Sequence, residues 1–390
     1  MSTTETTGTV IALDAQITAK QLVICKRLRV GSSRHHAWYR NVMIRGEYMY
    51  GGCGETYAQL AVYDDAPERD AVAIPYDTLA AACKGYKGTL CISGAVITRS
   101  DGASFGFDTG DDAADMARML HDEPILGAAD ECVTLSADAF VYATDAVASH
   151  ASADESRPVL TGIYVTNTGG GTDFAATDGY RLAICEIPKG DTYAATPGFY
   201  AIIPAKAMTV AATIAAKLHH CDAVVSIRTA NAHWTTISVV DSTIHARTII
   251  GQYPNYRNLL PDGCEGSIVF AAAPVIAALS TWGKDNSVGV FTPQAESCTL
   301  LLERRLAGDA ASSWVFGSLH ADSEQGAIAR VDSTLDFPIG ANGAYVKDAI
   351  ASVGTSMARM DILGALRPIV FRSGDDDPYQ VKVVVMPVRF

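Results

Sequence analysis

One segment of the chain, Gly102-Ala103-Ser104-Phe105-Gly106, matches a catalytic pattern of the form Gly-x-Ser-x-Gly. In hydrolases with this pattern, a strand precedes the serine and a helix follows it at once, so that the hydroxyl is exposed at the turn. Here the next residues are Phe107-Asp108-Thr109-Gly110, which start no helix. The alternation of Phe105 and Phe107 instead predicts a strand with both rings on one face. A serine hydrolase that uses Ser104 is kept as an alternative.

The other residues that could bind a nucleotide or a metal lack the required spacing. Neither Gly51-Gly52-Cys53-Gly54 nor Gly169-Gly170-Gly171 leads into the Gly-Lys-Ser/Thr of a phosphate loop. The pairs His35-His36 and His219-His220 are adjacent, and adjacent side chains diverge instead of converging on an ion. The sequence therefore predicts no metal, no cofactor and no enzymatic activity.

The nine cysteines are scattered, and no two of them form a Cys-x-x-Cys pair. This distribution favours reduced thiols over a zinc site or a disulfide framework. The N-terminus, Met1-Ser2-Thr3-Thr4-Glu5, lacks the basic and apolar regions of a secretory signal. The most apolar helical stretch, residues 269–279, is too short to span a bilayer. We therefore expect a soluble, cytoplasmic protein.

The chain is acidic, with 30 Lys and Arg against 43 Asp and Glu and a net charge of −13. This balance argues against a protein that simply coats DNA, which would carry a basic face. It is compatible with a protein that holds DNA on one concave surface, because local fields decide where a polyanion binds.

A repeated pattern divides the chain into thirds. It starts at Ile74-Pro75, Ile203-Pro204 and Ala341-Asn342, and apolar residues at helical spacing follow each start. Proline and asparagine are both typical of helix starts. The pattern predicts three domains of ordinary size, residues 1–129, 130–262 and 263–390.

Each third also carries further elements in the same order. An earlier candidate helix covers residues 19–29, 137–149 and 274–282, and alternating hairpin segments cover residues 89–107, 224–240 and 369–388. Two short helices packed on antiparallel strands predict the α+β class for each domain.

The last apolar segment, residues 383–388, contains Pro387. Proline removes a donor from the ladder of a sheet and is typical of an edge or a strand end. We therefore expect the tail to end at a sheet edge. The apolar residues Leu182, Leu160, Pro254 and Leu259 would complete a groove there for a peptide.

Three regions of the chain together carry a family resemblance. The first is Ser156-Arg157-Pro158-Val159-Leu160-Thr161-Gly162, followed by Ala176-Thr177-Asp178-Gly179-Tyr180-Arg181-Leu182-Ala183. The second is Gly251-Gln252-Tyr253-Pro254-Asn255-Tyr256-Arg257-Asn258-Leu259-Leu260-Pro261, and the third is Val385-Met386-Pro387-Val388-Arg389-Phe390. These regions resemble the bacterial replicative sliding clamp, the beta subunit of DNA polymerase III.

The resemblance implies a fold, a function and a set of partners. Three clamp domains per chain would form a head-to-tail homodimeric ring that encircles duplex DNA without reading its sequence. The ring would tether the replicative polymerase and would also bind the clamp loader and other proteins with a clamp-binding motif. Such a protein catalyses no reaction and needs no membrane.

The resemblance also assigns residues to three surfaces. The partner-peptide cleft would comprise Leu160, Thr177, Gly179, Tyr180, Arg181, Leu182, Pro254, Asn258, Leu259, Val384, Met386, Pro387, Val388 and Arg389. The DNA-facing cations would be Lys20, Lys26, Arg27, Arg29, Arg34, Lys84, Lys87, Lys206, Lys217 and Lys347. The dimer interface would include Phe105, Phe107 and Trp282.

The chain departs from the family pattern at several positions. Asn258 stands where many clamps have a basic residue, and Phe390 replaces a usual leucine. The first helix of the middle third carries Asp138 and Asp145 and no basic residue. These departures leave open a paralogue, a virus-encoded clamp, or a clamp-shaped interaction protein that binds peptides without encircling DNA.

Overall fold

A computed structural model describes the chain at the following residues: 10–29, 40–53, 55–62, 71–108, 116, 131–218, 223–230, 233–261, 263–280, 288–294, 299–305, 313–320, 328–331, 339–354, 356–364, 366–374 and 377–389. The chain forms two compact units. The first comprises Met1–Ala137 with Lys206–Thr248, and the second comprises Asp138–Ala205 with Ile249–Phe390.

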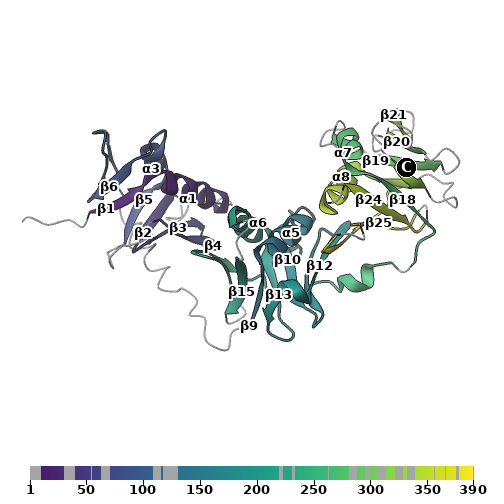
Figure 1. Cartoon of the computed structure of the whole chain (residues 1–390), viewed down its shortest axis with the longest axis horizontal. Helices are drawn as coiled ribbons and strands as arrows, with labels where there is room; N and C mark the ends of the chain where they lie inside the picture. The colour runs from purple at the N-terminus through teal and green to yellow at the C-terminus, as the bar shows by residue number, and fades with distance from the viewer. Residues whose placement is uncertain are drawn as a thin grey trace, which may run out of the picture. The chain divides into compact units, whose positions relative to one another are not determined.

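In the described part of the chain, the first unit contains two antiparallel sheets and the helices α1, α3 and α6 (Figure 1). One sheet has the order β1-β6-β7-β8, and the other runs β9-β15-β16-β17-β4-β3-β2-β5. The bounds are β1 Ile11–Asp14, α1 Ala15–Leu28, β2 Asn41–Arg45, β3 Tyr48–Cys53, β4 Thr56–Ala61, β5 Val72–Pro75, α3 Tyr76–Cys83, β6 Thr89–Ser93, β7 Val96–Arg99, β8 Ser104–Gly106, β9 Glu131–Ser136, α6 Ala205–Ala215, η3 Ala216–Leu218, β15 Val224–Ala230, β16 Trp234–Val239 and β17 Ser242–Arg247.

The second unit contains a nine-stranded sheet of order β14-β10-β11-β12-β26-β25-β24-β18-β22 and a second sheet of order β21-β20-β19-β23. The bounds are α5 Ala137–Ala148, η1 Pro158–Leu160, β10 Gly162–Asn167, β11 Gly171–Thr177, β12 Arg181–Pro188, η2 Lys189–Asp191, β13 Thr192–Ala195, β14 Tyr200–Pro204, η4 Tyr256–Leu259, β18 Gly266–Ala271, α7 Ala272–Ser280, β19 Val288–Gln294, β20 Thr299–Arg305, β21 Ser313–His320, β22 Ile328–Val331, β23 Ile339–Asn342, α8 Gly343–Ser352, β24 Met357–Ile362, β25 Ile369–Arg372 and β26 Gln380–Val385.

The helix starts confirm the repeated pattern. Pro75 precedes α3, Pro204 precedes α6, and the Asn342 side chain caps α8 by accepting from the amides of Ala344 and Tyr345. The first helix begins earlier than the expected residue 19, because the Asp14 carboxylate accepts from the amides of Gln16 and Ile17 and fixes the start there.

Both large sheets cross the expected domain boundaries. β17 pairs with β4, so strands of the middle and first thirds form one sheet. β12 pairs with β26, so strands of the middle and last thirds form another. The three-domain division stays a prediction, and within each unit the sheet is shared between adjacent thirds.

Two expectations about single strands have different outcomes. Ser104 begins β8, a strand at the end of its sheet, and no helix follows in residues 105–108, so the structure lacks a nucleophile elbow there. Residues 383–388, which were expected to end at a sheet edge, complete β26 as far as Val385 and continue beyond that strand. β26 lies inside the sheet, between β12 and β25, because its apolar side chains are buried among those of both neighbours.

Candidate partner-binding site

The site begins at a tight turn between β11 and β12. Asp178 Oδ1 accepts from the amides of Tyr180 and Arg181 at 2.9 and 3.0 Å, and Thr177 Oγ1 accepts from the Gly179 amide at 3.1 Å. Gly179 has a φ of +94°, a region that favours glycine. The turn thus joins β11 to β12 and holds Tyr180 at its tip.

The apolar floor of the site comes from four adjacent strands. Leu182 on β12 and Val384 on β26 occupy paired positions, and both are buried. Ala175, Ile184 and Val370 join them in one cluster, on one face of the sheet. Leu182 and Val384, two of the predicted cleft residues, are thus buried and form the floor of the site.

The segment leading into η4 covers this floor with aromatic rings. Tyr253 and Tyr256 are buried in the same cluster, and Tyr164 stacks on Tyr253 with ring centroids 4.8 Å apart. The Tyr256 hydroxyl donates to Asp173 at 2.7 Å. Burial raises the pKa of Asp173, while the bond from Tyr256 opposes that rise. The predicted cleft residues did not include Tyr164, Asp173, Tyr253 or Tyr256. Only Tyr253 and Tyr256 lie in a segment that carried the family resemblance.

Three apolar side chains next to this floor are exposed to solvent. Tyr180 is 62% exposed and precedes β12, and Met386 is 47% exposed and follows β26, the strand paired with β12. Leu259 closes η4 and is also exposed, while its neighbour Leu260 packs against the cluster. Exposed apolar side chains next to a rigid apolar floor are typical of a surface that anchors a peptide.

Arg181 lies apart from the other predicted cleft residues. Its guanidinium donates to Asp178 at 3.0 Å, to Asp348 on α8 at 2.6 Å and to the Ser149 carbonyl at 2.6 Å. It also lies over the Tyr345 ring. Successive side chains of a strand point to opposite faces, so Arg181 faces the helices while Leu182 faces the floor. The expected contact between Arg181 and a peptide is not available in this arrangement.

The C-terminal tail leaves the sheet after Val385. Pro387 forms an isolated bridge with Ala341 of β23, and the Val388 amide donates to the Gly340 carbonyl at 2.8 Å. The proline thus lies against the edge strand of the smaller sheet, outside β26.

The remaining predicted cleft residues are distributed around the cluster. Leu160 is buried, but it is Val159 of η1 that packs on the cluster. Pro254 is half-buried, and Asn258 and Arg389 are exposed.

Comparison with known proteins links the middle of the chain to one family. The model of the DNA polymerase III beta subunit, central domain, matches residues 134–255, which include the turn and η1 of the site. The middle third of the chain is thus similar to that central domain.

The curated relatives of this chain are distant in sequence. The Beta sliding clamp of Synechococcus elongatus is 25% identical over 264 residues, covering 66% of each chain, and that of Streptomyces coelicolor is 25% identical over 271 residues, also covering 66% of each. These alignments span just under two thirds of the curated relatives.

Solved structures match the fold of almost the whole chain. The Pseudomonas aeruginosa DNA polymerase III beta subunit has a TM-score of 0.75 at 17% identity, covering 98% of this chain and 100% of that one. The Thermotoga maritima subunit has a TM-score of 0.76 at 14% identity, with 98% and 99% covered. The predicted α+β fold is confirmed.

The predicted DNA-facing cations of this chain lie mainly in the first unit. Lys20, Lys26 and Arg27 are exposed on α1, and Lys206 and Lys217 are exposed on α6 and η3. Arg27 also donates to Thr213 of α6 at 2.9 Å.

The other described cations of this set are either partly buried or packed against a ring, or they lie outside a helix. Arg29 stacks its guanidinium over the Tyr76 ring, and Lys347 on α8 is half-buried. Lys84 is the C-cap residue of α3, and Lys87 follows it. Both were expected within that helix, and neither lies in it. Arg34 lies outside the described residues.

The predicted dimer residues are described in part. Phe105 lies in β8, at the end of the sheet order β1-β6-β7-β8, and Phe107 follows it with its amide bonded to the Ala95 carbonyl. Both rings are half-buried. Trp282 lies outside the described residues, as do the adjacent histidines 35–36 and 219–220.

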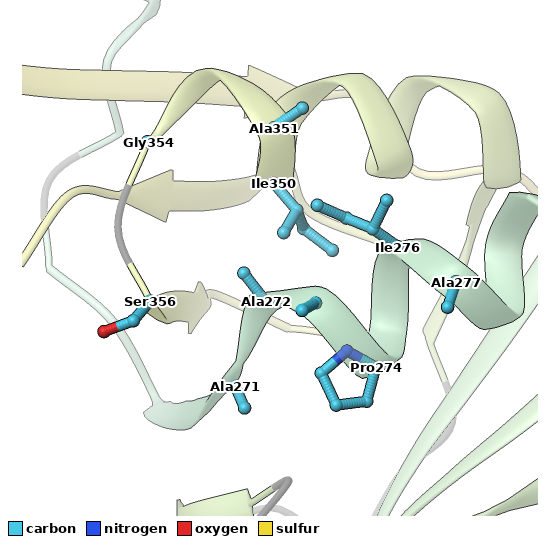
Figure 2. Close-up of a pocket in the computed structure, with 10 residues that line it drawn as sticks. Ala271, Ala272, Pro274, Ile276, Ala277, Ile350, Ala351, Gly354 and Ser356 are labelled. Atoms are coloured by element: carbon cyan, nitrogen blue, oxygen red, sulfur yellow. The ribbon is translucent and has the colours of Figure 1, made fainter.

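One hollow lies away from the site, between α7 and α8 (Figure 2). It has a volume of about 960 Å³, and Ile276 and Ile350 point into it. Its lining of Ala, Pro, Ile, Gly and Ser side chains contains no ionisable group. Among the described residues no group of three or more His, Cys, Asp or Glu could hold a metal, and no helix is long and apolar enough to cross a membrane.

Proposed function

We propose that this protein is a DNA sliding clamp, a homodimeric ring that encircles duplex DNA and tethers the replicative polymerase. The single observation that carries the proposal is the built site at the β12–β26 junction within a clamp-family fold. There the family's middle-domain turn and the C-terminal strand combine into one surface with exposed Tyr180 and Met386.

The site supports partner binding because its turn and floor are rigid and its exposed surface is apolar. Main-chain bonds fix the turn, and a buried cluster fixes the floor. A short linear peptide carrying glutamine and apolar residues would place its anchors on Tyr180, Met386 and Leu259. The replicative polymerase, the clamp loader and other proteins with such a motif would compete for this surface.

The ring itself would supply the retention on DNA. A closed ring resists dissociation without tight contacts, so a few exposed cations of α1 and α6 suffice for transient phosphate contacts. Scattered cysteines, of which seven are free in the described part of the chain, support a reducing, cytoplasmic location as part of the same proposal.

Retention on circular DNA tests the proposal. The protein is assembled on a nicked circle with a clamp loader and ATP, separated by gel filtration, and then treated with a nuclease that cuts the circle once. We expect the protein to stay with the circle and to leave once the DNA is linear. Equal retention on both forms would show ordinary binding, and no retention on either would reject an encircling ring.

A second candidate is a clamp-shaped protein that binds partner peptides without encircling DNA. The observation that favours it is the charge of the helices in the second unit. α7 has no charged residue, α5 carries Asp138 and Asp145 without a cation, and α8 has only Lys347 against Asp348. Peptide binding without any retention on the circle would support this candidate.

A further inference from the structure

A buried carboxylate lies on the floor side of the sheet, away from the turn at Tyr180. Asp173 is 3% exposed and occupies β11 two positions before Ala175, a member of the floor cluster. Side chains two positions apart on a strand share a face, so Asp173 lies on the face that η4 covers. A carboxylate buried without partners is strongly unfavourable, so this side chain requires donors from the segment that covers it.

Two donors to this carboxylate come from adjacent residues of η4. The Tyr256 hydroxyl donates to Asp173 Oδ2 at 2.7 Å, and the Arg257 guanidinium donates to the same oxygen. The Tyr256 side chain is buried, and its ring makes an edge contact with the ring of Tyr164 on β10. The guanidinium of Arg257 also lies 5.7 Å from the Tyr256 ring centroid. One carboxylate therefore holds η4 to the sheet through two consecutive side chains.

The same short element carries Leu259, one of the three exposed apolar side chains of the site. Leu259 is 53% exposed, while its neighbour Leu260 packs against the cluster. The Leu260 amide donates to the Arg257 carbonyl at 3.3 Å, and the Asn258 amide donates to the Asn255 carbonyl at 3.2 Å. These main-chain bonds tie Leu259 to the residues that contact the carboxylate. The position of Leu259 at the surface therefore depends on how η4 is held to the sheet.

We propose that Asp173 is a positioning residue for partner binding, which holds η4 in the place where Leu259 anchors an apolar residue of the partner peptide. The proposal rests on the proposed function of the site and adds to it a residue that touches no peptide. Tyr256 and Arg257 transmit the effect, because each contacts the carboxylate and belongs to the element that carries the anchor. The effect of Asp173 on binding is therefore expected to pass through Leu259 alone.

A double-mutant cycle, measured by calorimetry on the full-length protein, tests this coupling. The probe is one short synthetic peptide of glutamine and apolar residues. We expect Asp173→Asn and Leu259→Ala each to weaken its binding roughly threefold to thirtyfold. In the Leu259→Ala background, Asp173→Asn should have little further effect, because the anchor that it positions is already gone. In the Met386→Ala background it should keep its full factor, since the Met386 amide is held by the Tyr180 carbonyl instead.

Further measurements separate positioning from a loss of the fold. Tyr256→Phe removes one of the two bonds and leaves Arg257 on Asp173, so it should lose a smaller part of the affinity. Glu186→Gln removes the carboxylate that is paired in register with Asp173, and it should bind the peptide as the wild type does. In Asp173→Asn, amide hydrogen exchange should quicken in η4 and stay unchanged in β12. Circular dichroism on heating shows whether each variant is folded.

Each other outcome counts against a specific step. Wild-type affinity in Asp173→Asn, or unchanged exchange in η4, overturns the positioning role and leaves the apolar site intact. Equal factors for Asp173→Asn in the Leu259→Ala and Met386→Ala backgrounds would mark a general effect on the fold and overturn it as well. Wild-type affinity in Leu259→Ala removes that anchor and this inference, and leaves the pair of Tyr180 and Met386. Failure of the wild-type protein to bind the peptide removes the proposed site itself.

Discussion

The Met386 amide donates to the Tyr180 carbonyl at 2.9 Å, just beyond the last strand pair of β12 and β26. This bond joins the tip of a turn in the middle third to the C-terminal tail. Both side chains remain exposed beside it. A partner that bound one of them would meet the other, so the two residues form one binding surface.

Truncation of this pair should weaken peptide binding without unfolding the protein. We expect Tyr180→Ala or Met386→Ala to reduce the affinity for a clamp-binding peptide by about 1 to 3 kcal/mol, because exposed anchors carry much of an interface's energy. Tyr193→Ala is a matched control, since Tyr193 is 58% exposed in the same unit and lies on β13, outside the proposed site. Calorimetry that gives one affinity for all four proteins would reject the site.

Arg181 should act on stability and not as a direct peptide contact. Arg181→Gln removes a guanidinium shared by Asp178 and Asp348, one of which is half-exposed, so we expect a loss of about 1 to 3 kcal/mol of unfolding free energy. Urea denaturation measures this loss. At temperatures where the variant is folded, its peptide affinity should be close to that of the wild type, and a large affinity loss with unchanged stability would contradict the arrangement.

Stability should fall in mild acid because of His150. This side chain is buried with Nε2 2.9 Å from Ser352 Oγ, and burial, followed by the nearby Arg181 charge, lowers its pKa from 6.5 to about 3. The unfolded state therefore binds the proton first as the pH falls. The contribution is fully present above pH 6.5 and is lost progressively toward pH 3, by up to about 1.4 kcal/mol per pH unit.

The His150→Gln variant separates this effect from general acid denaturation. Its unfolding free energy should depend less on pH between 6.5 and 3 than that of the wild type. His245 lies in the other unit, and burial lowers its pKa to about 4, so it contributes to the same window and leaves a residual slope. Identical pH profiles for wild type and variant would show that His150 does not contribute.

DNA contact should depend on the cations of α1 and be independent of sequence. Lys20, Lys26 and Arg27 are exposed on this helix. Each phosphate contact that is removed should reduce the slope of log affinity against log salt by about 1. Replacing the three by glutamine should therefore flatten the salt dependence measured by fluorescence anisotropy. Strong discrimination between duplex sequences at fixed salt would contradict phosphate contact alone.

The dimer should depend on an aromatic contact at the end of the β1-β6-β7-β8 sheet. β8 leaves one side of its ladder available in the described part of the chain, and Phe107 follows it. We expect Phe107→Ala with Trp282→Ala to shift the protein toward monomer in analytical ultracentrifugation, at a cost of roughly 2 kcal/mol or more. The Met386→Ala variant should sediment as the wild type. An unchanged dimer in the double variant at low concentration would place the interface elsewhere.

The sequence by itself determined the helices, the hairpins and the turn, because those follow from local signals. Pro75, Pro204 and Asn342 mark helix starts, and Asp178-Gly179 marks a turn, each through bonds or dihedral angles within a few residues. The motifs also indicated the resemblance, since the middle-domain segment that carried it lies in the region that the family model matches.

Only the tertiary structure decided which side chains of the site are accessible. The apolar run of β26 predicts burial or an edge equally well, and its place between β12 and β25 depends on pairing with strands remote in sequence. Leu182 and Arg181 are adjacent in the chain, yet one lies in the floor and the other pairs with α8, because a strand directs neighbouring side chains to opposite faces. The pairing of Arg359 with Arg372 and of Arg372 with Lys382 arises in the same way, from the register of three strands, and the order of residues along the chain does not reveal it.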